Sequence, residues 1–160
     1  MKKKDILFLC CGLLFAGLAY SFNHSKRATV AEPSKWATAV EPWTPTQLES
    51  PEELANIIKD PKAKQPIIFC IGPGAVIKGS IDIGPARDSQ NLAKFKQQLT
   101  HLPKDAEIII YCGCCPFEHY PNIRPAFALL NQMAFTRQKL LNIEHNVKID
   151  WINKGYPVMP

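Results

Sequence analysis

Three cysteines occupy four consecutive positions in the second half of the 160-residue chain, in the segment Cys112-Gly113-Cys114-Cys115. A cysteine reacts as its thiolate, which is favoured by exposed backbone N–H groups and by the positive end of a helix. A helix is expected to follow this segment, so both influences are available to it. The segment, together with the residues that lead to that helix, is called the cysteine loop below.

The first chemistry open to the cysteine loop is nucleophilic catalysis. Cys112 is the candidate nucleophile, because it comes first after an apolar run. The candidate substrate-binding residues are Gly113, Cys114, Cys115 and Arg124. Arg124 would start the following helix, and its fixed positive charge suits an anionic substrate.

Two other kinds of chemistry remain open. A soft metal ion would accept ligands from Cys112, Cys114, Cys115 and His119, although the second ligand pair of an ordinary zinc site is missing. A structural disulfide is the third possibility, with Cys112 or Cys70 as the partner, because adjacent cysteines bridge only under strain. No resident cofactor is expected.

The position of Cys112 favours function independently of its chemistry. Residues 107–111 form a continuous apolar run after Glu107, which is typical of a parallel strand buried on both faces. Ligands of open α/β sheets bind beyond the carboxyl ends of strands. Cys112 is the first residue beyond this predicted strand.

The remaining elements follow from apolar periodicity, caps and prolines. Ser50 as N-cap, Pro51 at the first helical position and Glu53 predict one helix start. Helices are expected at 51–60, 89–102, 125–135 and 150–154, and strands at 66–71, 81–83, 107–111 and 139–143. The alternation predicts an α/β fold, a three-layer domain with a central, mostly parallel sheet of about five strands flanked by helices.

The N-terminus has the order of a secretory signal. Three lysines precede an apolar stretch at 6–20, and small residues suited to cleavage follow, so residues 1–21 are predicted to be a signal peptide. The alternative is an uncleaved anchor that tethers the protein to the inner membrane through residues 6–20. Either way the protein is expected to be exported, periplasmic or otherwise extracytoplasmic. Residues 22–45 are interpreted as a Pro-containing linker whose Trp36 and Trp43 pack back on a domain at 46–160.

Composition excludes two broad classes. The chain has 19 Lys+Arg against 14 Asp+Glu, and 46% of its residues are hydrophobic, so disorder throughout is excluded. Beyond the leader no Lys/Arg cluster remains, so no nucleic-acid partner is expected. The sequence carries no indication of oligomeric state.

Four segments resemble, in order and spacing, those of a rhodanese-like domain over residues 46–158. They are GSIDIGPA at 79–86, LPKD at 102–105, IIYC at 109–112 and WINKGYPV at 151–158. The resemblance implies that Cys112 carries sulfur: its thiolate attacks a sulfane donor such as thiosulfate, and a thiol acceptor collects sulfur from the resulting persulfide. The implied partners are a small sulfur-containing anion and a thiol.

The sequence also departs from the family pattern. Eleven residues separate Cys112 from Arg124, which makes a longer loop than the family's, and Cys70 and Ser80 replace an Asp and a His. Because the strands bearing Cys70 and Cys112 are neighbours in that fold, Cys70 or Cys114 is a candidate resolving thiol. Cys70 as a buried small hydrophobe is the alternative. The alternative function is a non-catalytic module that binds a metal ion or protein partner, or exchanges disulfides, through the cysteine loop.

Overall fold

The computed structural model describes residues 41–114 and 121–160. The strands are β1 (Leu48–Glu49), β2 (Ile67–Cys70), β3 (Ile81–Asp82), β4 (Glu107–Tyr111) and β5 (Arg137–Leu141). The helices are α1 (Pro51–Lys59), α2 (Ser89–Thr100), α3 (Ile123–Gln132) and α4 (Val147–Asp150), with 3-10 turns at Pro45–Gln47 and Ile152–Lys154.

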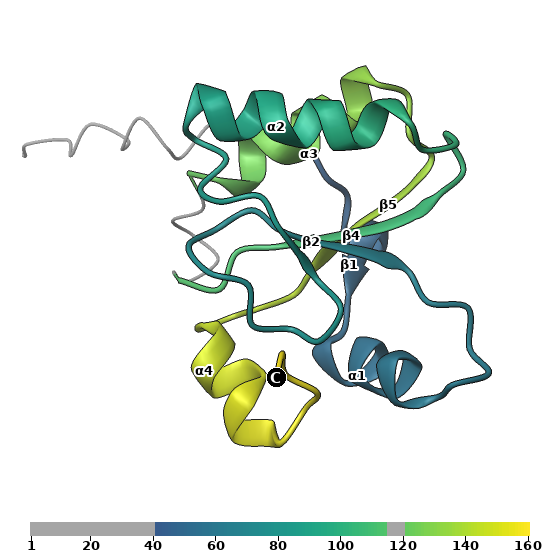
Figure 1. Cartoon of the computed structure of the whole chain (residues 1–160), viewed down its shortest axis with the longest axis vertical. Helices are drawn as coiled ribbons and strands as arrows, with labels where there is room; N and C mark the ends of the chain where they lie inside the picture. The colour runs from purple at the N-terminus through teal and green to yellow at the C-terminus, as the bar shows by residue number, and fades with distance from the viewer. Residues whose placement is uncertain (1–40, 115–120) are drawn as a thin grey trace, which may run out of the picture. The chain divides into compact units, whose positions relative to one another are not determined.

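The strands form one sheet in the order β1-β5-β4-β2-β3, and every strand pair in it is parallel. Helices α2 and α3 lie on one side of the sheet, and α1 and α4 lie on the other (Figure 1). The predicted α/β fold with helices flanking a parallel sheet is confirmed. In the register of β2 against β4, Cys70 stands opposite Tyr111.

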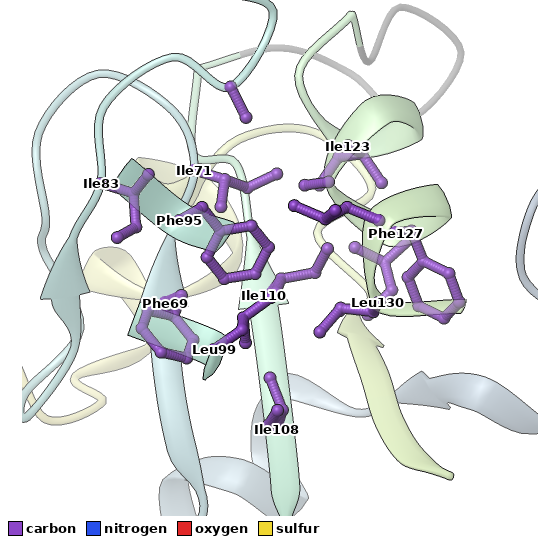
Figure 2. Packing of buried hydrophobic residues seen from close by; sticks show 14 of the residues in the cluster. Phe69, Ile71, Ile83, Phe95, Leu99, Ile108, Ile110, Ile123, Phe127 and Leu130 are labelled. Atoms are coloured by element: carbon purple, nitrogen blue, oxygen red, sulfur yellow. The ribbon is translucent and has the colours of Figure 1, made fainter. Parts of the chain in front are cut away.

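The sheet separates two apolar clusters. The cluster beneath α2 and α3 combines Phe69 of β2 and Ile110 of β4 with Phe95 and Phe127 from the two helices (Figure 2). Phe69 and Phe95 meet edge to face, with their ring centroids 5.1 Å apart. The cluster on the α1 side is built around Leu54, Tyr111 and Trp151, among others. Burial on both faces explains the continuous apolar runs of the central strands.

The helix starts follow local capping. In α1 the Ser50 hydroxyl accepts a hydrogen bond from the Glu53 N–H, as its predicted N-cap role requires. Helix α3 begins at Ile123, two residues before its predicted start at Pro125. Pro125 lies in the first turn, where a missing N–H breaks no intrahelical bond. The predicted helix at 150–154 is instead α4 followed by a 3-10 turn, and it ends at Gly155 in the left-handed region.

The last strand forms earlier in the chain than predicted. Strand β5 starts at Arg137 rather than at Lys139, because the polar side chains of its first two residues each have a partner. Arg137 forms an ion pair with Glu107 of the neighbouring strand, and Gln138 donates to Asn131 of α3. The two-residue β1 was not predicted from the sequence, since so short a strand leaves no periodic pattern.

The predictions for the leader at 1–21, for Trp36 and for residues 22–40 of the linker fall outside the described residues. The described end of that linker contacts the domain: the Trp43 ring packs edge to face on Phe127 at 5.8 Å between centroids. Pro42 also accepts a hydrogen bond from Asn131 of α3. No helix within 41–114 and 121–160 is long and apolar enough to cross a membrane.

Candidate functional site

Cys112 is the first residue beyond the carboxyl end of the central strand β4, as the sequence predicts. Its side chain is only 1% exposed and joins the apolar cluster beneath α2 and α3. Among the described residues, two groups approach its sulfur: Cys114 Sγ lies 3.4 Å away, and the Asn122 Nδ2 group donates a hydrogen bond over 3.5 Å. The structure therefore brings Cys112 and Cys114 of the predicted site residues into contact.

Gly72 makes room for the Cys112 sulfur. This glycine follows β2, the neighbour of β4 in the sheet. A Cβ atom at position 72 would lie 2.7 Å from Cys112 Sγ and 3.3 Å from its Cα. Only glycine lets the two segments approach this closely without displacing the thiol.

Asn122 was missed by the sequence analysis. It holds the N-cap position of α3, but its side chain makes no capping bond to the helix. Instead its Oδ1 accepts the Arg87 N–H at 3.1 Å, which turns the amide nitrogen toward Cys112 Sγ. The side chain is buried, with 4% exposure. A residue of N-cap type before a predicted helix was the only local signal.

The Cys112 sulfur lies beside the Asn122 amide, at the N-terminal end of α3. An amide N–H stabilises an anion by a charge-assisted hydrogen bond, and the first residues of α3 present the positive end of the helix dipole. Ile123, the first residue of α3, packs in the same apolar cluster as Cys112. Among the described residues no carboxylate hydrogen-bonds to the Cys112 sulfur.

Gly113, which was predicted to bind substrate, makes a structural contact that the sequence did not predict. Its carbonyl accepts the Val147 N–H at 3.0 Å, and a Cβ at position 113 would lie 2.9 Å from the Val147 side chain. The cysteine loop is therefore fixed at its start against the first residue of α4. The tight fit explains the glycine without any reference to a substrate.

Cys70 lies on the opposite face of the sheet from Cys112. Its side chain is fully buried in the cluster on the α1 side. The thiol donates to the carbonyls of Gly74 at 3.4 Å and Gly72 at 3.7 Å. Burial raises the pKa of this thiol above its ordinary value. These contacts agree with the alternative in which Cys70 is a buried small hydrophobe.

Tyr111, the residue before Cys112, holds the segment that follows β2 by hydrogen bonds. Its hydroxyl oxygen accepts the N–H groups of Val76 at 2.9 Å and Ile77 at 3.2 Å, and it lies 3.1 Å from Ser80 Oγ. Ser80 Oγ in turn donates to the Ile77 carbonyl, so the Tyr111 hydroxyl donates to Ser80. Burial raises the pKa of Tyr111 to about 12.

The C-terminal segment contacts the same segment after β2 that Tyr111 holds. Val158 forms an antiparallel bridge with Ile77, and the Pro157 carbonyl accepts the Lys78 N–H at 3.1 Å. The Trp151 indole N–H donates to that same carbonyl at 2.8 Å. Three of the four segments quoted for the family resemblance, 79–86, 109–112 and 151–158, thus converge around the Tyr111 hydroxyl and the residues that it holds.

Of the remaining predicted site residues, the structure describes Arg124. The Arg124 guanidinium, in the first turn of α3, forms an ion pair with Glu41. Cys115 and His119 lie outside the described residues. Within 41–114 and 121–160, no group of three or more His, Cys, Asp or Glu side chains is arranged to hold a metal ion.

The sequence matches no protein-family model and no curated protein.

Proposed function

We propose that this protein is an exported rhodanese-like sulfurtransferase that carries sulfane sulfur as a persulfide on Cys112. The proposal depends on the groups that surround the Cys112 sulfur. A buried sulfur at the carboxyl end of a central parallel strand receives an amide N–H from Asn122, and Gly72 leaves it space. That combination suits a nucleophilic thiolate better than a thiol that only packs in a core.

The proposed reaction begins with attack of the Cys112 thiolate on the outer sulfur of thiosulfate or another sulfane donor. A new S–S bond forms on Cys112, the donor's S–S bond breaks, and sulfite leaves with the electron pair of that bond. The negative charge moves from the Cys112 sulfur to the terminal persulfide sulfur and the leaving sulfite. N–H groups of the loop and of Asn122 would stabilise these charges.

Two further observations support the rhodanese-like interpretation of the domain at 46–160. The strands that carry Cys70 and Cys112 are neighbours, as the resemblance requires. The three converging segments make specific contacts, including the Tyr111–Ser80 and Trp151–Pro157 hydrogen bonds. Segments that resemble a family's segments in order and also meet in space give stronger support than their order alone.

The experiment is a single-turnover measurement with the reduced full-length chain, thiosulfate and no added thiol. We expect about one equivalent of sulfite per protein, and none from Cys112→Ser. Sulfite reports the first step whatever later happens to the persulfide. The proposal fails if the reduced wild type releases no sulfite from thiosulfate and takes up no sulfur from a polysulfide. Bound copper or zinc that survives dialysis in such a protein would then favour the binding-module alternative.

A further inference from the structure

The contact between Cys112 and Cys114 suggests how the persulfide reacts further. We propose that Cys114 is the resolving thiol: it attacks Cys112 Sγ of the persulfide, expels hydrosulfide and leaves a Cys112–Cys114 disulfide. This inference rests on the proposed function and deepens it. The product would be hydrosulfide, rather than a sulfur atom handed intact to an acceptor.

The geometry favours attack at Cys112 Sγ. The two Sγ atoms lie 3.4 Å apart, which is already van der Waals contact. Formation of a disulfide bond of about 2.05 Å requires them to approach by only about 1.4 Å more. Cys114 is exposed and lies in a bend, whereas Cys112 is held by β4 and by its buried neighbours. The approach can therefore come from Cys114 while Cys112 stays in place.

Cys70 is poorly placed for the same role. Its thiol lies in the apolar cluster on the α1 side and donates to two backbone carbonyls there. Cys112 belongs to the cluster on the other side of the sheet. To reach the Cys112 sulfur, Cys70 would have to leave its strand register with Tyr111 and break those contacts.

The step balances without an external oxidant. The Cys114 thiolate forms a bond to Cys112 Sγ, and the bond between Cys112 Sγ and the outer sulfur breaks. The outer sulfur takes the electron pair and a proton and leaves as hydrosulfide. Two protein thiols are oxidised to a disulfide while one sulfane sulfur is reduced to sulfide. Each new cycle then requires a dithiol reductant, small or proteinaceous, that reduces the disulfide by exchange.

The test uses the same single-turnover reaction and adds a sulfide trap, monobromobimane, and intact-protein mass. For the wild type we expect sulfide and sulfite in nearly equal amounts, and a protein about 2 Da lighter than the reduced form. For Cys114→Ser we expect the same sulfite, at least about tenfold less sulfide, and a protein about 32 Da heavier because the persulfide persists. Cys70→Ala should release sulfide as the wild type does.

The outcomes separate this inference from the proposed function. Absence of sulfite from both the wild type and Cys114→Ser, together with no sulfur uptake from a polysulfide, would defeat the proposed function itself. Sulfite without sulfide from the wild type, with the added 32 Da retained, would overturn only the role of Cys114. The same holds if Cys115→Ser, rather than Cys114→Ser, stops sulfide release. Transfer of the added sulfur to Cys114, seen by fragment mapping, would make the loop a sulfur relay and would also overturn the inference.

Discussion

Cys70 is the last residue of β2 and Cys112 is the first residue after the neighbouring β4, and their thiols have different hydrogen-bond partners. Because Cys70 pairs with Tyr111 in register, and side chains alternate along a strand, the next residue, Cys112, faces the other side. Cys70 is enclosed by the α1-side cluster, and its thiol binds backbone carbonyls. Cys112 meets an amide N–H and a second thiol.

The two thiols meet different kinds of hydrogen-bonding group, backbone carbonyls at Cys70 and an amide N–H at Cys112. A carbonyl stabilises the S–H form, which keeps a cysteine neutral and inert, whereas an N–H donor stabilises the anion. Gly72 serves both residues: its carbonyl accepts from the Cys70 thiol, and its missing side chain leaves space for Cys112 Sγ. One sheet edge thus presents a structural cysteine and a candidate nucleophile. Reactivity of Cys112 toward iodoacetamide is the measure that tests this contrast.

Gly72→Ala should give the largest change. The new methyl group would lie 2.7 Å from Cys112 Sγ, so either the sulfur or the segment after β2 must move. Overpacking of this kind costs about 1–3 kcal/mol, and displacement of the thiol from Asn122 should lower its alkylation rate at least about tenfold. Sulfite release from thiosulfate should fall in parallel.

Gly79→Ala is the matched control for this change. At Gly79 φ is +80° and the space beside it is open, so alanine strains the backbone without touching Cys112. We expect a stability loss of about 1 kcal/mol with little change in the Cys112 alkylation rate. Equal effects of the two substitutions on alkylation would mean that backbone stability, rather than space at the sulfur, controls Cys112.

Asn122→Asp should have the next largest effect. The carboxylate can still accept the Arg87 N–H, but it presents an oxygen where the amide nitrogen now faces Cys112 Sγ. A like charge beside the thiolate disfavours it, so alkylation at neutral pH should slow about tenfold. Asn131→Asp, on the same helix but bonded to Pro42 and Gln138, is the control. If Cys112 is alkylated at the wild-type rate in Asn122→Asp, then Asn122 does not influence the reactivity of Cys112.

Much of this arrangement was predictable from the sequence, because buried parallel strands are continuous apolar runs. The run 107–111 correctly placed Cys112 just beyond a central strand. The first two residues of β5 were not predicted as strand because they are polar, and Glu107, which pairs with Arg137, lies thirty residues earlier. The role of Asn122 could not be predicted for a similar reason. It depends on a hydrogen bond from the backbone N–H of Arg87, thirty-five residues earlier in the chain. Local patterns carry no information about such distant partners.

Tyr111→Phe should separate stability from reactivity. Loss of the Tyr111 hydroxyl leaves the part-buried N–H of Val76 and the buried N–H of Ile77 without their acceptor, which should lower the free energy of unfolding by about 2–3 kcal/mol. Since Tyr111 faces away from Cys112, alkylation should change by no more than about threefold at constant folded fraction. Urea unfolding and alkylation rates check both expectations. A tenfold loss of alkylation in the folded protein would contradict the separation of the two faces.

The same residue predicts a pH dependence of stability. The folded pKa of Tyr111 is raised to about 12 from an ordinary value of 10.0, so the unfolded chain loses this proton first as pH rises. The contribution of Tyr111 is fully present below pH 10 and is lost between pH 10 and about 12, where stability should fall. Urea titrations of the wild type across this range should decline more steeply than those of Tyr111→Phe. Equal slopes would contradict the raised pKa.

Cys70→Ala should have the smallest effect on Cys112. The substitution removes one sulfur from the α1-side cluster, and the small cavity should cost about 1 kcal/mol of stability. The Cys112 neighbours, Asn122 and Cys114, are on the other face and stay in place, so its alkylation rate should remain within about twofold of the wild type. A loss of more than tenfold in a folded protein would show that the two cysteines act together. Cys70 would then belong to the reactive site, and the contrast between the two faces would fail.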